Sequence, residues 1–122
     1  MEGTGETTAV VLVYMGETVF GASVGDSGAW MLNDDRIFDL TSAQKRKPLL
    51  GTGSAMICPL SSNYCIGTLL VATDGLFKYA LRERINEIAL ESPLEQAAAD
   101  LIKLVRLPSG GLQDDVAVVL CR

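Results

Sequence analysis

The sequence predicts an α+β domain in which antiparallel strands form layers flanked by helices. Three observations lead to this class. The first 40 residues consist of β-branched and apolar runs separated by short turns, two later segments repeat their apolar residues with a helical period, and a β-rich run follows them. The composition agrees, because 48% of the 122 residues are hydrophobic and 20% are charged, which is enough to build a core.

Four strands are expected in the first 40 residues. The run 7–14 is apolar or β-branched on both alternating faces, which is typical of a strand covered on both sides. We interpret it and the three runs that follow as an antiparallel meander with turns at Met15-Gly16 and 33–35. The three further strands are expected at residues 17–24, 27–32 and 36–40.

A long irregular connection and a buried strand come next. Residues 41–63 contain a basic triplet, two prolines and two glycines without any periodicity, so we predict a loop. Residues 67–73 then form an apolar run that ends at Asp74. The run predicts a buried strand that delivers a carboxylate at its end.

Two helices and a last strand complete the prediction. Leu81, Ile85 and Ile88 share one face of a helix over 76–90. Ser92-Pro93-Leu94-Glu95 matches a capping box with proline at the first helical position. The apolar stripe of that second helix is formed by Leu94, Ala98, Leu101 and Val105. We expect residues 108–111 to end this helix and 115–121 to form a strand. The sequence has no internal repeats and no low-complexity linkers, so we expect residues 1–122 to be one unit.

Composition excludes several classes of function. The net charge of -5 and the scattered basic residues argue against a nucleic-acid partner. The acidic, glycine-rich start and the lack of a long apolar run predict no signal peptide, no membrane contact and a cytoplasmic location. The absence of histidine removes Ser-His-Asp and Cys-His nucleophilic pairs. The three cysteines, without C-x-x-C spacing, predict reduced and buried thiols (Cys58, Cys65, Cys121).

Three acidic turns, each beside an apolar run, are the candidate functional residues. They are 24–28 around Asp26, 72–76 around Asp74, and 113–116 around Asp114 and Asp115. Each taken alone has a structural reading, because Asp-Gly is a common turn and paired aspartates can be a solvated strand entrance. Taken together, carboxylates at strand ends can converge on one rim of a sheet, where a hard divalent cation would bind between them.

The order of these turns resembles the later motifs of the metal-dependent serine/threonine protein phosphatases, the PPM or protein phosphatase 2C type. Residues 24–32 are similar to the Gly-Asp-Ser-Arg strand pair of that family, 69–76 to its Leu-Leu-x-x-Ser-Asp-Gly-Leu, and 114–119 to its closing Asp-Asn-x-Thr-x-Val-Val. Residues 5–10 and 40–41 resemble its Gly-x-Thr-Ala and Leu-Thr elements in the same order. The resemblance therefore covers nearly the whole chain.

The resemblance implies a site, a cofactor and a substrate. Asp74 and Asp114 would ligate a catalytic pair of Mn²⁺ or Mg²⁺ ions, Gly75 would lie beside them, and Asp26 would lie near an additional metal site. The substrate would be a phosphoprotein, hydrolysed at phosphoserine or phosphothreonine by attack of a metal-bound hydroxide.

Departures from the family pattern favour an alternative. Gly28 stands in place of the usual Arg, Lys78 in place of a frequent acidic residue, and Asp115 in place of Asn. The first metal motif of the family, Asp-Gly followed by His or Met and two glycines, does not occur in the sequence, so the phosphatase fold is expected to be incomplete at its amino terminus.

Three interpretations follow from the motifs and the departures. This chain could be the carboxy-terminal part of a phosphatase domain that is inactive in isolation. It could be a non-catalytic, pseudophosphatase-like interaction module, or an α+β domain whose acidic turns are structural. The incomplete fold predicts exposed apolar surface, which would bind the amino-terminal half of such a domain or a second copy of the chain.

Overall fold

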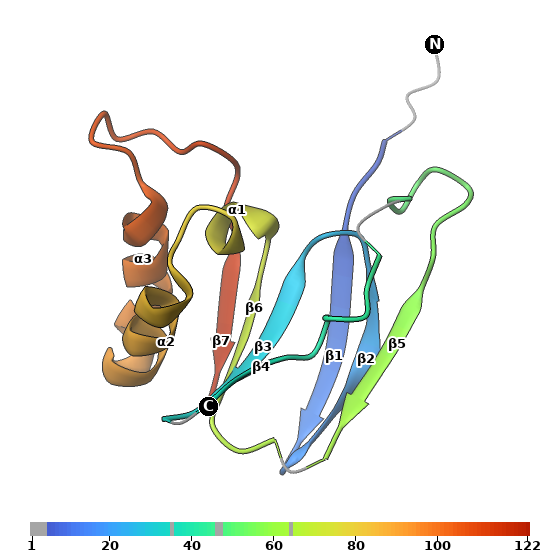
Figure 1. Cartoon of the computed structure of the whole chain (residues 1–122), viewed down its shortest axis with the longest axis horizontal. Coiled ribbons are helices and arrows are strands. Elements are labelled where there is room, and N and C mark those ends of the chain that lie inside the picture. The colour runs from blue at the N-terminus through green and yellow to red at the C-terminus, as the bar shows by residue number, and fades with distance from the viewer. Residues whose placement is uncertain (1–4, 35, 46–47, 64) are drawn as a thin grey trace.

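The computed structural model describes residues 5–34, 36–45, 48–63 and 65–122, and it contains three layers. Figure 1 shows the helices on one side, a four-stranded sheet in the middle and a three-stranded sheet on the other side. Both sheets are antiparallel, so the predicted α+β class with β-sandwich layers is confirmed. The helices flank one outer side of the sandwich.

The three-stranded sheet has the order β1-β2-β5. Strands β1 (Ala9–Met15) and β2 (Thr18–Val24) form a hairpin in which Val13 pairs with Phe20. Strand β5 (Cys58–Ser62) adds to β2 on the other edge. β5 contains Pro59, which lacks an amide donor and is tolerated because β5 lies at the edge of its sheet.

The four-stranded sheet has the order β4-β3-β6-β7. Its central strands, β3 (Gly28–Leu32) and β6 (Thr68–Ala72), are almost entirely buried, as the apolar runs predict. Strands β4 (Ile37–Asp39) and β7 (Val118–Cys121) form its edges. The sheet thus places the ends of β3 and β6 side by side, close to Asp26 and Asp74 in sequence.

The helical layer covers one face of the four-stranded sheet. It comprises α1 (Asp74–Phe77), α2 (Arg82–Glu91) and α3 (Leu94–Val105). The core between helices and sheet is centred on Leu32, Leu70, Leu76, Ile85 and Leu101. A second core between the two sheets is formed by Val19, Met31, Cys65 and Leu69.

The predicted meander is wrong, because β2 and β3 lie in different sheets. The chain leaves the three-stranded sheet at Val24 and enters the four-stranded sheet at Gly28. Gly25 lies buried at this crossing with φ of +90°. A Cβ there would lie 2.6 Å from Thr8 Cγ2, so both the conformation and the space favour glycine.

Residues 41–63 and 76–90 also differ from prediction. The expected loop contains β5, whose alternation is short and interrupted by Pro59. The expected single helix is two helices, since the chain breaks between Phe77 and Arg82, and Leu81 is 70% exposed rather than part of an apolar face. The strand expected at 115–121 is regular from Val118 onward. The turn predicted at 33–35 includes Asp35, which lies outside the described residues, as do two members of the basic triplet at 45–47.

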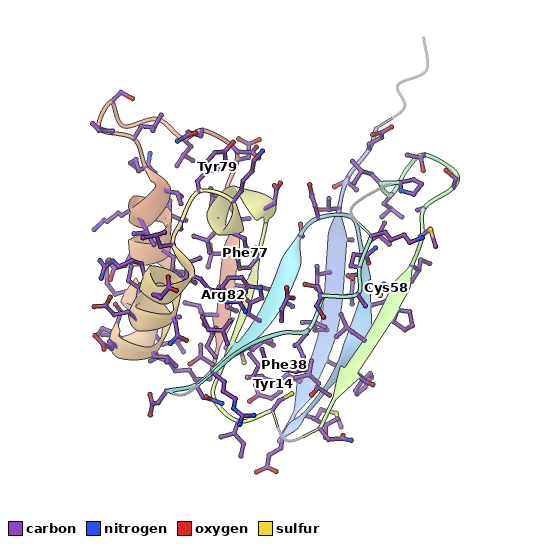
Figure 2. All side chains as sticks on the ribbon, in the orientation of Figure 1. Tyr14, Phe38, Cys58, Phe77, Tyr79 and Arg82 are labelled. Atoms are coloured by element: carbon purple, nitrogen blue, oxygen red, sulfur yellow. The ribbon has the colours of Figure 1, made fainter. Side chains whose placement is uncertain are left out.

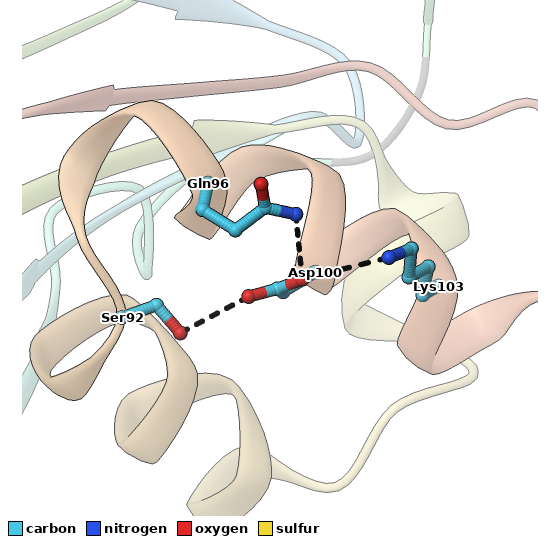
Figure 3. A network of polar contacts seen from close by, with 4 residues as sticks. All are labelled: Ser92, Gln96, Asp100 and Lys103. Carbon is cyan, nitrogen blue, oxygen red and sulfur yellow. Dashed lines mark hydrogen bonds and ion pairs between the residues drawn. The ribbon is translucent and has the colours of Figure 1, made fainter.

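The predicted capping box at Ser92 is wrong, although its helix is present. Pro93 is the N-cap residue of α3, and no side chain caps the helix. The Ser92 hydroxyl donates instead to Asp100 Oδ2 at 3.2 Å (Figure 3). Gln96 Nε2 donates to the other oxygen of Asp100 at 3.1 Å, and Lys103 Nζ lies 4.0 Å from it. The predicted stripe is partly displaced, because Ala97 is fully buried while Leu94 is 38% exposed.

Burial of β1 and of the cysteines differs from prediction as well. β1 alternates between half-buried and exposed positions, so one of its faces is uncovered. The three cysteines are free thiols as predicted, but Cys65 alone is buried, while Cys58 is half-buried and Cys121 exposed. Among the described residues, no helix has the length and apolar character needed to cross a membrane.

Candidate functional site

Two of the predicted acidic residues lie in one cavity. The cavity has a volume of about 320 Å³, and Asp26 and Asp74 both line it. Asp26 follows β2 at the crossing between the sheets, whereas Asp74 is the first residue of α1 and follows β6. Because β3 and β6 are paired, with Gly28 opposite Ala72, the segments that flank them meet at the same end of the sheet.

Thr73 fixes the position of the Asp74 turn. Its amide donates to the carbonyl of Ala117 at 3.1 Å, and the amide of Ala117 donates to Thr73 Oγ1 at 3.0 Å. The same hydroxyl donates to the carbonyl of Asp115 at 3.2 Å. The 115–117 segment is therefore tied to the residue that precedes Asp74, although the two are more than 40 positions apart in sequence.

Gly75 allows these two segments to approach each other. It is buried, and a Cβ at this position would lie 2.3 Å from the carbonyl oxygen of Asp115. Any other residue would force the turn and the 115–117 segment apart. The structure thus gives Gly75 a packing role, while its predicted place beside a metal stays a prediction.

Asp114 is close to this turn in the chain but is not among the residues that line the cavity. It is exposed, and its Oδ1 accepts a hydrogen bond from the amide of Asp115 at 2.8 Å. That contact is local, because it joins Asp114 to the residue that follows it. Asp114 directly precedes the 115–117 segment that is hydrogen-bonded to Thr73. Asp26 and Asp74 both line the cavity, whereas Asp114 does not.

Asp39 is a third acidic residue in the cavity, and the sequence analysis did not identify it. Its Oδ1 accepts hydrogen bonds from the amide of Thr41 at 2.9 Å and from Thr41 Oγ1 at 2.8 Å. Thr41 Oγ1 in turn accepts from the amide of Ala29 in β3 at 3.2 Å. The available signal was an aspartate at the end of a short strand, directly before the Leu-Thr pair.

Aromatic side chains form part of the cavity wall. Trp30 and Phe77 line it, with ring centroids 4.4 Å apart and planes inclined by 31°. The Arg82 guanidinium lies 4.8 Å from the centroid of Trp30 (Figure 2 labels Phe77 and Arg82). Gly28 makes room for this cluster, because a Cβ there would lie 2.7 Å from the Phe77 ring. This packing gives a physical reason for glycine where the phosphatase pattern has Arg.

Lys78 and Gln44 complete the polar lining. Lys78 is exposed, lines the same cavity as the aspartates, and has its Nζ 5.5 Å from the centroid of Tyr79. Gln44 Oε1 accepts from the buried Ser23 hydroxyl at 2.6 Å, which ties the loop after β4 to β2. The cavity therefore combines carboxylates, a primary amine and an amide in one partly open space.

The cavity has the right donor type for a divalent cation but too few donors. Carboxylate oxygens are the ligands that Mg²⁺ and Mn²⁺ prefer, and these ions require about six oxygens. Within the described ranges, no group of three or more Asp, Glu, Cys or His side chains is arranged to hold a metal ion. The described part of the chain thus does not form a complete metal site by itself.

Comparison with known proteins gives a match in structure. No protein-family model matches the sequence, and no curated protein matches it. The fold matches that of a bacterial serine phosphatase with a TM-score of 0.81 and 25% identity, over 94% of this chain and 52% of that chain.

Two structures of a second phosphatase extend the comparison. The serine/threonine phosphatase PstP/Ppp of Mycobacterium tuberculosis matches with a TM-score of 0.78 and 20% identity, over 94% of this chain and 59% of that one. The catalytic domain of PstP in complex with two manganese ions matches with a TM-score of 0.77 and 22% identity, over 94% and 57% of the two chains. This chain therefore has the fold of the bacterial PPM-type, protein phosphatase 2C-like, serine/threonine phosphatases, and it spans about half the length of the solved chains that it matches.

Proposed function

We propose that this chain is the carboxy-terminal part of a metal-dependent phosphatase that hydrolyses phosphoserine or phosphothreonine in proteins. One observation carries the proposal: Asp26 and Asp74, from acidic turns 48 positions apart, line one cavity in a chain with a phosphatase fold. The PstP complex with two manganese ions supports Mn²⁺ as the cofactor, and Mg²⁺ has the same ligand preference.

The residues of this chain would hold part of the site. Asp74 and Asp114 would each contribute a carboxylate to the metal ions, and Asp26 would serve an additional ion near the Asp74 turn. When bound, the metal would supply an activated water and neutralise the developing charge on the phosphate. Thr73 and Gly75 would position the Asp74 turn through their contacts with Asp115 and Ala117.

The remaining ligands and a phosphate-binding group would come from the amino-terminal part of the phosphatase fold, which this sequence does not contain. The isolated chain is therefore expected to bind Mn²⁺ weakly and to hydrolyse a phosphoester slowly or not at all. Activity should appear when the chain is joined to the amino-terminal half of a bacterial serine/threonine phosphatase.

The test is Mn²⁺-dependent hydrolysis of a phosphothreonine peptide by that joined protein. Asp74→Asn should lower kcat/KM by about 100-fold or more, because an amide keeps the shape of the carboxylate but loses the charge that attracts the metal. The matched control is Asp34→Asn, an exposed position near the β3–β4 turn, which should leave kcat/KM unchanged.

A second candidate function is supported by Lys78. Its primary amine lies in the same cavity as Asp26, Asp39 and Asp74 and can neutralise carboxylates without a metal. Such a cavity suits a non-catalytic interaction module. This candidate takes precedence if the joined protein is folded but inactive with Mn²⁺, or if Asp74→Asn is as active as the parent.

A further inference from the structure

Lys78 is the one basic side chain among the described residues that line the cavity of the candidate site. The acidic side chains of the same lining are Asp26, Asp39 and Asp74, and all three are half-buried. Carboxylates attract a lysine ammonium and a divalent cation alike, because both carry positive charge. The chain thus places a positive charge of its own in the cavity where a metal ion would bind.

The short helix α1 fixes Lys78 beside Asp74. The amide of Lys78 donates to the carbonyl of Asp74 at 2.8 Å, so the two residues are one helical turn apart and their side chains share one face. The Lys78 amine also lies 5.5 Å from the centroid of the Tyr79 ring, which is a cation–π contact. Asp26 reaches the same cavity from the crossing between the two sheets. Local helix geometry therefore keeps Lys78 at the cavity.

We infer that the Lys78 ammonium competes with a divalent cation for the carboxylates of this cavity and so raises the Mn²⁺ concentration at which the cation binds. The inference rests on the proposed function, since it concerns the same metal. An ammonium has donors only and no lone pair, so Lys78 is not itself a metal ligand. At a separation of about 6 Å in water, repulsion between an ammonium and a divalent ion lowers the affinity about tenfold.

The exposure of Lys78 allows both cations to use the cavity in turn. The side chain is exposed and has a flexible four-carbon stem, so its amine can turn toward solvent when a metal ion enters. At low Mn²⁺ concentration the ammonium neutralises part of the carboxylate charge, and at high concentration the metal ion replaces it. Lys78 would therefore control how much Mn²⁺ the site requires.

The test is a titration of the 122-residue chain with Mn²⁺, in which electron paramagnetic resonance measures the free ion. Lys78→Met keeps the apolar stem and removes the charge, so it should lower the Kd for Mn²⁺ about tenfold. Lys78→Arg keeps the charge and should leave the Kd at the parent value. The control is Lys103→Met, which makes the same change in net charge on α3, where the Lys103 amine lies 4.0 Å from Asp100. It should change the Kd about twofold or less, because salt screens distant charges.

Nuclear magnetic resonance of the same samples would locate the bound ion. Mn²⁺ should broaden the amide signals of Gly25 and Gly75, which are the chain neighbours of Asp26 and Asp74. In Lys78→Met the same signals should broaden at about one tenth of the Mn²⁺ concentration that the parent requires. If Lys78→Met does not give the parent circular dichroism spectrum, Lys78→Gln replaces it in both measurements.

The outcomes separate this inference from the proposed function. Mn²⁺ binding that Asp74→Asn weakens but Lys78→Met does not tighten overturns the inference alone. An equal gain in Lys78→Met and Lys103→Met also overturns it, because net charge would then explain the effect. Absence of Mn²⁺ binding to the parent and to every variant overturns the inference and contradicts the proposed function as well.

Discussion

Gly75 helps to set the position of the neighbouring Asp74 in the candidate site. Its missing side chain lets the first turn of α1 lie against the backbone of Asp115, and Thr73 fastens the same two segments with hydrogen bonds. Asp39, which also lines the cavity, is held by hydrogen bonds from Thr41, and Thr41 accepts one from the amide of Ala29. Contacts between backbone and small side chains therefore determine where Asp74 lies.

Gly75→Ala is expected to destabilise the protein by about 1–3 kcal/mol, because the new methyl group meets a backbone oxygen that cannot rotate away. The free energy of unfolding in urea measures the effect. Gly111→Ala is the matched control, since its Cβ would lie no closer than 3.8 Å to the Ser109 hydroxyl, an ordinary van der Waals distance. Equal stability of the two variants would show that the turn can move without cost.

At the scale of elements, Arg122 joins the sheet to the end of a helix. It follows β7, and its Nη2 donates to the carbonyls of Ala89 at 2.7 Å and Ser92 at 2.8 Å, at the carboxy-terminal end of α2. Its Nε donates to Thr68 Oγ1 in β6 at 3.3 Å. A cation at this end satisfies carbonyls that the helix leaves without internal partners.

Arg122→Gln should lower the free energy of unfolding by about 1–2 kcal/mol, because two helix-end carbonyls lose a charged donor. Arg84→Gln is a suitable comparison, since Arg84 pairs with Glu87 on an exposed helix face. Loss of that exposed pair should cost about 0.5 kcal/mol or less. Thermal and urea unfolding of both variants would measure the difference, and an equal loss would contradict a capping role for Arg122.

The whole molecule depends on the contact between its two sheets. Tyr14 of β1 crosses this contact, and its hydroxyl donates to the carbonyl of Cys65 at 3.2 Å. Burial raises the pKa of the Tyr14 phenol above its ordinary value of 10.0. The nearby Cys121, Cys65 and Glu17 raise this pKa further.

Stability should therefore fall at alkaline pH. In the unfolded chain the Tyr14 phenol ionises near pH 10, while in the folded protein it keeps its proton to higher pH. The stabilisation is thus complete below pH 10 and is lost as the pH rises through the folded pKa. Urea unfolding between pH 8 and about 11 should show a steeper decline for the parent than for Tyr14→Phe. Parallel declines would contradict this account.

The class of the fold, most of its strands and the third helix could be predicted from the sequence alone. Apolar runs identify β1, β2, β3 and β6. Successive side chains of a strand point to opposite faces, so burial of one face gives alternating apolar residues and burial of both faces gives a continuous apolar run. The same reading placed Asp26 and Asp74 at strand ends, and the structure brings both to one cavity. It also related the turns to the phosphatases that the fold matches.

The pairing of the strands and the covering of their faces could not be predicted, because both depend on contacts between segments that are distant in sequence. Nothing in the local pattern separates β2 from β3, so their division between two sheets depends on the buried turn at Gly25. β1 is apolar on both faces, yet one face is uncovered in the described chain, since burial depends on layers that sequence neighbours do not supply. The place of Asp39 in the cavity also depends on tertiary structure. Asp39 lies there because β4 pairs with β3, and the sequence around the other aspartates does not reveal this pairing.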